Sequence, residues 1–125
     1  SNVDNLLNKL EHSLRTALAD EGEQVHVFTH LSHVYGEGSS IYTSYVFRPG
    51  SSYAMALARW HKLKHAACQT IVNNHGTVSH QHGVGRDHAP YLAVEKGELG
   101  IAALQALSSH FDPDQRLAPG VLLVK

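Results

Sequence analysis

The sequence predicts an α+β fold in which helices pack on one face of a small, mostly antiparallel sheet. Two patterns support this class. Three segments carry apolar residues at helical spacing, and two neighbouring segments alternate as β-strands do. A turn rich in glycine and histidine separates the last two helical segments. The expected order is α-β-β-α-β-α, and at 125 residues we expect the whole chain, 1–125, to form one domain.

The first helix is expected over residues 3–20, because apolar side chains recur there at helical spacing and Gly22 follows as a stop signal. Residues 24–35 come next and are rich in β-branched and aromatic types, which favours a strand. Their alternation places His33 on the same face as Val27. The chain therefore begins with a helix followed by a strand.

A second alternating run covers residues 41–48 and ends at Pro49-Gly50. Residues 36–39, with the sequence Gly-Glu-Gly-Ser, supply turn chemistry between the two runs, so together they predict a β-hairpin. So thin a sheet leaves exposed edges, which a missing neighbour or a second copy in a homodimer would cover.

Two further helices are expected, over residues 53–74 after a Ser51-Ser52 cap and over residues 94–110. The inward stripe of the first is predicted to be Leu57, Trp60, His61, Lys64, Cys68, Ile71 and Val72. That of the second is predicted to be Leu99, Ala102, Ala103, Leu104 and Leu107. Between the helices we expect a short third strand over 77–79, and the tail over 117–123 should be irregular or extended.

Composition narrows the class of partner. Hydrophobic residues make up 42% and charged residues 17%, as in globular proteins. A net charge of -1 offers no basic field for nucleic acid or anionic lipid, so neither is an expected partner. No segment is long and apolar enough to cross a bilayer. The single cysteine, Cys68, cannot form an internal disulfide and suits a reducing compartment, so we expect a cytoplasmic protein.

The eleven histidines concentrate in two places. His30 and His33 lie near the end of the first strand, and His80, His82 and His88 lie in and after the glycine-rich turn. Imidazole titrates near neutrality and suits proton transfer, anion contact or metal ligation. Four of these histidines could chelate one ion, which would make the chain a non-catalytic metal-binding module. Zinc sites usually add cysteine or carboxylate at tight spacing, so we assign no metal ligands.

Three other side chains are candidates on position alone. Tyr42 could face the same cleft as the histidine turn or be a buried structural tyrosine. Arg86 and Asp87 could bind an anionic group or pair with each other. Gly83 and Gly85 do not form a dinucleotide-binding fingerprint, because the strand-Gly-x-Gly-x-x-Gly-helix context is absent.

Three segments carry a resemblance to a known family: residues 76–86 (GTVSHQHGVGR), 111–113 (FDP) and 117–123 (LAPGVLL). They resemble the C-terminal end of the FAD-linked oxidases of the vanillyl-alcohol-oxidase type. The hairpin segments 29–35 (THLSHVY) and 40–45 (SIYTSY) are similar to the substrate-domain hairpin of that group. Within it, the chain looks closest to the alkyldihydroxyacetonephosphate synthases and their bacterial relatives.

The resemblance implies a two-domain flavoenzyme, of which this chain is the last part of a partly ferredoxin-like cap domain. A flavin-binding N-terminal domain of the same protein would hold FAD, and the cap would shape a pocket for a small-molecule or lipid substrate. The synthases exchange the acyl chain of an acyl-dihydroxyacetone phosphate for a fatty alcohol in ether lipid synthesis. We expect the isolated chain to be inactive and not to hold FAD.

Residue roles follow from the same resemblance. The synthases have three consecutive histidines where this chain has His80, Gln81 and His82. Tyr42 falls on their active-site tyrosine. The resemblance implies catalytic roles for Tyr42, His80 and His82, and flavin contacts for His80 and Gly83. It also implies substrate contacts for Gln81, Arg86 and His33. An amide cannot take a proton near neutral pH, so proton transfer would fall to the imidazoles or the phenol.

A sister branch, the D-lactate, glycolate and 2-hydroxyglutarate dehydrogenases, supplies the main alternative. That branch has Glu-His-Gly where this chain has Gln81-His82-Gly83, and a second histidine where this chain has Tyr42. Those residues form a metal site there, and this chain lacks the carboxylate and one imidazole. FAD-dependent oxidation of a 2-hydroxy acid is therefore the alternative. A structural interaction domain, suggested by the sheet edges, is a third.

Overall fold

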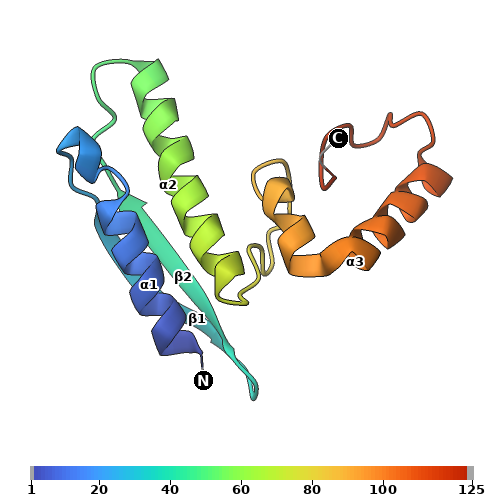
Figure 1. Ribbon diagram of the computed structural model, residues 1–125, viewed down its shortest axis with the longest axis horizontal. Coiled ribbons are helices and arrows are strands. Elements are labelled where there is room, and N and C mark those ends of the chain that lie inside the picture. Colours follow the sequence, from blue (N-terminus) through green and yellow to red (C-terminus); the bar gives the residue numbers. More distant parts are fainter. Residues whose placement is uncertain (1, 124–125) are drawn as a thin grey trace. The chain divides into compact units, whose positions relative to one another are not determined.

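A computed structural model describes residues 2–123, which form two compact units that divide between Asn74 and His75. The first unit contains the helix α1 (Val3–Thr16), the 3-10 helix η1 (Ala19–Glu21), the strands β1 (His26–Val34) and β2 (Ser39–Val46), and the helix α2 (Tyr53–Asn73) (Figure 1). The second contains α3 (Ala89–Phe111). The predicted α+β class and the succession of its helices and hairpin strands are confirmed.

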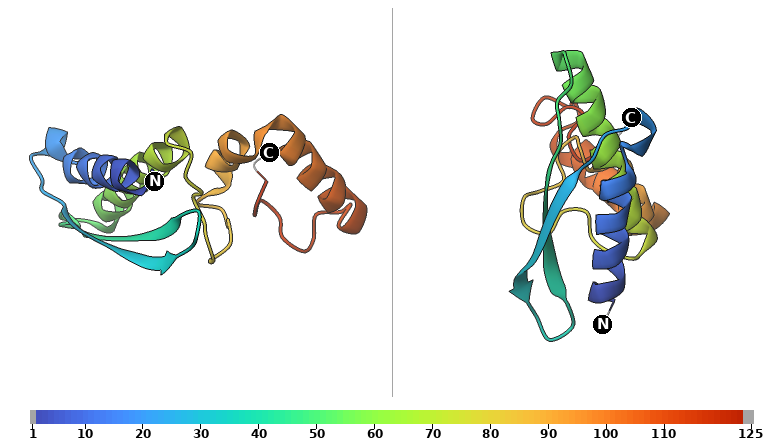
Figure 2. Two further views of the ribbon diagram at one scale, coloured as in Figure 1. Left: turned by 90° about the horizontal axis from the view of Figure 1, so that it is seen from below. Right: turned by 90° about the vertical axis from the view of Figure 1, so that its left-hand side faces the viewer.

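The first unit is a two-layer structure. The helices α1 and α2 lie on the same side of the β1–β2 hairpin, as Figure 2 shows most clearly in its left view. Between the layers lies a core of six buried apolar residues: Leu10, Leu14, Leu18, Val25, Val27 and Leu63. Removing these side chains from water stabilises the unit. The expected packing of helices on one face of the sheet is therefore confirmed.

Local signals set the helix ends of this unit. The predicted stop at Gly22 is confirmed, because this glycine takes a left-handed conformation with φ of 68° that a side chain would disfavour. The regular part of α1 is shorter than expected, since a turn and η1 replace its last residues. The cap of α2 is confirmed too. The Ser52 Oγ accepts a hydrogen bond from the Met55 N–H at 3.2 Å.

The hairpin carries a β-bulge that the alternation pattern did not predict. Leu31 lies opposite Ile41, but His33 lies opposite Ser40, which leaves one extra residue on β1 between Leu31 and His33. The bulge changes the face on which His33 lies. Since Ser40 shares a face with Tyr42, His33 joins Tyr42 rather than Val27, and its predicted facing is wrong.

The buried side of α2 also differs from its predicted stripe. Leu63 is fully buried at 0% exposure although it lies outside that stripe, whereas Leu57 and His61 lie in the stripe and are exposed. The burial of Cys68 is confirmed. Arg59 is also buried, which no apolar pattern predicts. This helix has apolar residues on several sides, so periodicity alone does not choose the face that meets α1.

The second unit departs most from expectation. The helix α3 begins at Ala89 and is kinked at Gly97, where φ is 69° and ψ is 173°. Ala89 and Leu92 are its buried residues, while Leu99 and Leu107, predicted to face inward, are 85% and 56% exposed. The predicted inward stripe was therefore wrong. Among the described residues of this unit α3 is the only regular element, so no sheet or second helix of the unit covers that stripe.

The segment 77–79 does not form the expected third strand, because the sheet within residues 2–123 has two strands, β1 and β2. The Val78 N–H bonds to a side chain of α3 instead. The irregular tail is confirmed, and it returns to the glycine turn, where the Leu122 N–H donates to the Gly85 carbonyl at 3.3 Å. None of the helices described has both the length and the apolar character needed to traverse a bilayer.

Candidate functional site

One face of the hairpin packs on the helices, and the opposite face carries the candidate tyrosine. Tyr42 lies opposite His30, and their rings stack with centroids 5.1 Å apart and planes 27° apart. Tyr42 is 44% exposed. We call this surface the open hairpin face. Its members are His26, Phe28, His30, His33, Ser40, Tyr42, Ser44 and Val46. Since none is Asp, Glu, Lys or Arg, the face offers imidazole, hydroxyl and phenol groups for hydrogen bonds, together with apolar contact.

The bulge fixes the position of His33 on this face. The Ser32 hydroxyl lies 2.9 Å from His33 Nδ1, and the Ser39 hydroxyl donates to the His33 carbonyl at 2.7 Å. The imidazole also stacks on Tyr35, with planes only 5° apart. These contacts hold His33 near the turn end of the hairpin.

The candidate histidines of the second unit lie at the tip of a narrow bend. We call residues 79–83 the histidine bend. The Ser79 hydroxyl donates to the Gly83 carbonyl at 2.5 Å and so joins the two ends of the bend. Gly83 takes φ of 78° although nothing lies within 4 Å of the point that a Cβ would occupy, so the backbone conformation is what requires glycine there. The side chains of residues 80–82 are exposed.

Further hydrogen bonds hold the chain after the bend. The His88 Nδ1 lies 3.1 Å from the Val84 carbonyl, at the start of α3. The Arg86 guanidinium donates to the Pro119 carbonyl at 3.2 Å. Arg86, the arginine expected to contact substrate, therefore also connects the segment after the bend to the C-terminal tail.

A carboxylate that sequence reasoning missed holds the chain before the bend. Glu95 accepts hydrogen bonds from the Thr77 hydroxyl at 2.8 Å and from the Val78 N–H at 3.0 Å. Burial by itself raises the pKa of Glu95, but hydrogen bonds from Lys96, Val78 and Thr77 outweigh it and hold that pKa below its ordinary value. No sequence signal marks this residue, because a glutamate in a helix is ordinarily expected to be solvated.

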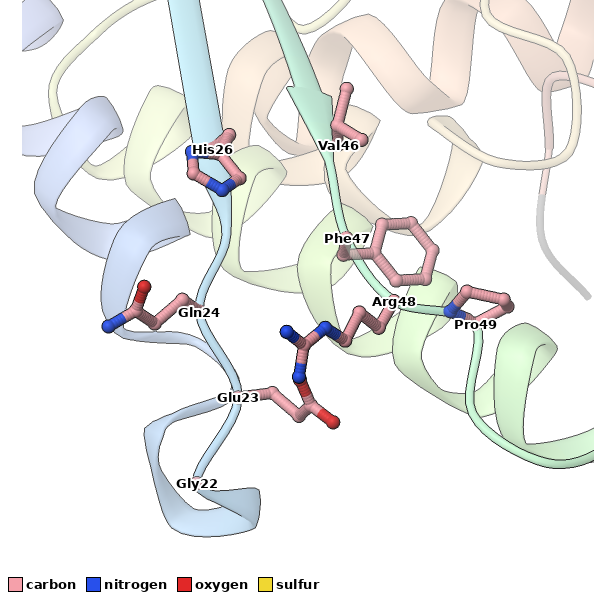
Figure 3. A pocket seen from close by; sticks show the side chains of 8 residues that line it. All are labelled: Gly22, Glu23, Gln24, His26, Val46, Phe47, Arg48 and Pro49. Atoms are coloured by element: carbon pink, nitrogen blue, oxygen red, sulfur yellow. The ribbon is translucent and has the colours of Figure 1, made fainter.

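A hollow of about 530 Å³ lies at the open end of the hairpin, where His26 and Val46 form part of its lining (Figure 3). Its lining includes Glu23 and Arg48, whose charged groups face each other 3.8 Å apart. Behind them the buried Arg59 donates to Glu21 at 2.8 Å and to the Arg48 carbonyl at 2.7 Å. None of the predicted site residues lines this hollow, and its charges satisfy one another. We therefore assign this region a structural role.

The structure thus gathers the predicted site residues into two groups. Tyr42 and His33 lie on the open hairpin face of the first unit. His80, Gln81, His82 and Gly83 lie in the histidine bend of the second, with Arg86 just beyond it. Within residues 2–123, no cluster of three or more His, Cys, Asp or Glu side chains is arranged to hold a metal ion.

Each group by itself offers chemistry that suits a flavin. The phenol and imidazoles of the open hairpin face, beside the 62% exposed Phe28, can hydrogen-bond to the edge of a ring system and contact its apolar surface. The imidazoles and amide of the histidine bend can hydrogen-bond to the edge of a ring system in the same way.

Comparison with known proteins agrees with this chemistry. The family model described as FAD linked oxidases, C-terminal domain, matches residues 1–122. The alkyldihydroxyacetonephosphate synthase of Trypanosoma brucei brucei is 26% identical over 114 residues, 91% of this chain and 18% of that protein. The synthase of Caenorhabditis elegans is 29% identical over 93 residues, 74% of this chain and 15% of that protein.

A relative with another name matches a shorter stretch. The glycolate oxidase subunit GlcD of Bacillus subtilis (strain 168) is 44% identical over 50 residues, 40% of this chain and 11% of that protein. The chain therefore spans less than a fifth of the length of each of these relatives. No solved structure matches the chain significantly.

Proposed function

Because the chain belongs to the family of C-terminal domains of FAD linked oxidases, we propose that it forms the substrate side of an FAD-dependent enzyme. The first candidate reaction is the alkyl-for-acyl exchange of ether lipid synthesis. In this exchange a fatty alcohol replaces the acyl chain of an acyl-dihydroxyacetone phosphate, and the acyl chain leaves as a fatty acid. The observation that carries the proposal is the match to synthases over most of the chain, together with an exposed Tyr42.

The open hairpin face would supply the phenol. Tyr42 stacks on His30, and this contact would favour one orientation of the phenol ring before any substrate arrives. A phenol can hold or give a proton at its Oη, which suits a position beside a reacting oxygen or carbon. His33, on the same face, would contact the polar part of the substrate.

The histidine bend would supply the imidazoles. His80 and His82 would move protons at their ring nitrogens, and the Gln81 amide would orient the substrate by donating and accepting hydrogen bonds. Arg86 would hold an anionic group such as a phosphate. His80 and the Gly83 backbone would contact the flavin, which when bound supplies an acceptor for an electron pair.

The rest of the protein would hold the flavin. The chain spans 18% of the length of the trypanosome synthase, and we place the flavin-binding domain N-terminal to it in the same polypeptide. The isolated chain would then be inactive and would hold FAD weakly or not at all.

Oxidation of a 2-hydroxy acid is the second candidate, favoured by the 44% identity to GlcD over 50 residues. Gln81 and Tyr42 weigh against it, because neither is a ligand of the kind a divalent metal needs for that chemistry. Offering the flavin-loaded protein a fatty alcohol with acyl-dihydroxyacetone phosphate, and separately D-lactate or glycolate with a dye acceptor, distinguishes the two.

The residue assignment is tested in the flavin-loaded full-length protein. We expect Tyr42→Phe and His82→Ala each to lower kcat by about a hundredfold or more, since each removes a proton-transfer group, while flavin content stays unchanged. Tyr53→Phe and His12→Ala are matched controls, because both side chains are exposed on helices of the first unit. Turnover equal to that of the controls would refute the assignment.

A further inference from the structure

We propose that Glu95 is a positioning residue that fixes the backbone of residues 77–79 and thereby the direction of the histidine bend. The structural part of this inference stands on contacts within the second unit. Its catalytic consequence rests on the function proposed above.

Both carboxylate oxygens of Glu95 are engaged. Oε1 accepts from the Thr77 hydroxyl at 2.8 Å and lies 2.9 Å from Lys96 Nζ, while Oε2 accepts from the Val78 N–H at 3.0 Å. The Glu95 side chain is only 13% exposed. Charge-assisted hydrogen bonds to two adjacent donors fix the orientation of a segment as well as its position.

The Glu95 carboxylate accepts the backbone hydrogen bond that a neighbouring strand was expected to accept. Residues 77–79 pair with no strand in the part of the chain described, so a part-buried N–H at Val78 needs another acceptor. An unmade hydrogen bond there would cost free energy, and Glu95 supplies the acceptor from α3. The helix thus substitutes for a strand in aligning this segment.

The bend is held at both ends, and Glu95 makes the contacts at the first of them. Glu95 holds the segment before the bend, and the His88 contact to the Val84 carbonyl holds the segment after it. The hydrogen bond from the Ser79 hydroxyl to the Gly83 carbonyl keeps the two ends of the bend together. Because that contact joins the two ends of the bend, releasing Thr77 and Val78 would let residues 79–83 shift together about the remaining anchor at Val84.

The structural part is tested by NMR on the 125-residue chain. We expect Glu95→Ala to speed amide exchange at Val78 by about tenfold or more, because the carboxylate is the acceptor of that N–H, and to shift the amide signals of residues 80–82. Glu95→Gln should have a smaller effect, since one oxygen acceptor remains. Glu98→Ala, which removes an exposed carboxylate from the same helix, should leave both measurements unchanged.

A second pair of variants avoids altering α3. Thr77→Val removes the hydroxyl that donates to Glu95, whereas Thr77→Ser keeps it. We expect the valine variant to shift the amide signals of the bend and the serine variant to restore them. Unchanged Val78 exchange in Glu95→Ala, or an equal change in Glu98→Ala, would overturn the proposal.

The catalytic consequence is tested in the flavin-loaded full-length protein. A misplaced bend should lower kcat about ten- to a hundredfold with a smaller change in KM, in Glu95→Ala and Thr77→Val but not in Thr77→Ser or Glu98→Ala. Faster Val78 exchange with wild-type turnover in Glu95→Ala, while His82→Ala is inactive, would overturn the positioning role. Full turnover in His82→Ala would instead refute the residue assignment of the proposed function, and the altered bend would still support the structural part.

Discussion

The two units of the molecule are stabilised by different means. In the first, residues from two helices and a hairpin bury a continuous apolar core that includes Leu14 and Leu63. In the described part of the second, the buried apolar residues are Ala89 and Leu92, and hydrogen bonds between the backbone and side chains, such as that from the Val78 N–H to Glu95, hold the loops. Apolar burial is non-directional and stabilises the first unit as a whole. Hydrogen bonds are directional, so they also fix the orientation of a loop.

Glycine use shows the same contrast. In the second unit, Gly83 and Gly85 take positive φ around the histidine bend and Gly97 takes it inside α3. In the first, Gly22 takes it at the end of a helix, where such a glycine is an ordinary stop, and Gly50 takes it between β2 and α2; both lie away from His33 and Tyr42 in the sequence. The second unit therefore uses backbone conformation to shape its candidate site.

The sharpest test of this contrast is a core truncation. Leu63→Ala should lower the free energy of unfolding of the first unit by about 2–5 kcal/mol, because the fully buried side chain leaves a cavity between the layers. Urea titration followed by the fluorescence of Trp60, the single tryptophan, measures this transition.

The matched control is Leu99→Ala, the same substitution on a side chain that is 85% exposed. We expect its effect on the stability of either unit to stay within about 0.5 kcal/mol. A loss comparable to that of Leu63→Ala would mean that the exposed face of α3 is packed in solution, and the contrast between the units would fail.

Sequence reasoning succeeded where the signal was local. The Ser52 cap, the Gly22 stop and the hairpin turn each depend on a few adjacent residues, so they could be predicted. The choice between Leu57 and Leu63 depends on which side of α2 meets α1, and the sequence of one helix does not contain that information.

The candidate site, too, could be predicted only where its signals are local in sequence. The histidine bend follows from glycines beside histidines, but the facing of His33 depends on a bulge that simple alternation cannot reveal. Glu95 was missed because its partners, Thr77 and Val78, lie 18 and 17 residues away in a segment predicted to pair with a strand.

A backbone substitution tests the second unit with a smaller expected effect. Gly97→Ala should destabilise α3 by about 1–3 kcal/mol, because φ of 69° with ψ of 173° is accessible almost only to glycine. Nothing lies within 4 Å of a Cβ at this position, so the cost comes from the backbone alone. Amide exchange along α3 measures it. Gly36→Ala is the control, a turn glycine with equal space and no positive φ. Equal exchange in the two variants would show that the kink is not required.

The smallest expected effect is the pH dependence of the Glu95 contact. Its folded pKa lies below the ordinary value of 4.5, so its stabilising contribution is fully present above that value and is lost as pH falls through the folded pKa. The Val78 amide proton should therefore shift as pH falls, with a midpoint below 4.5, as the carboxylate that accepts it becomes protonated. In Glu95→Gln the same signal should stay nearly constant.

Glu11 and Asp20 also have lowered pKa values but lie in the first unit, so the Val78 signal reports on the second unit. A midpoint above 4.5 would mean that burial outweighs the hydrogen bonds to Glu95, and the second unit would then lose the directional contact that distinguishes it from the first.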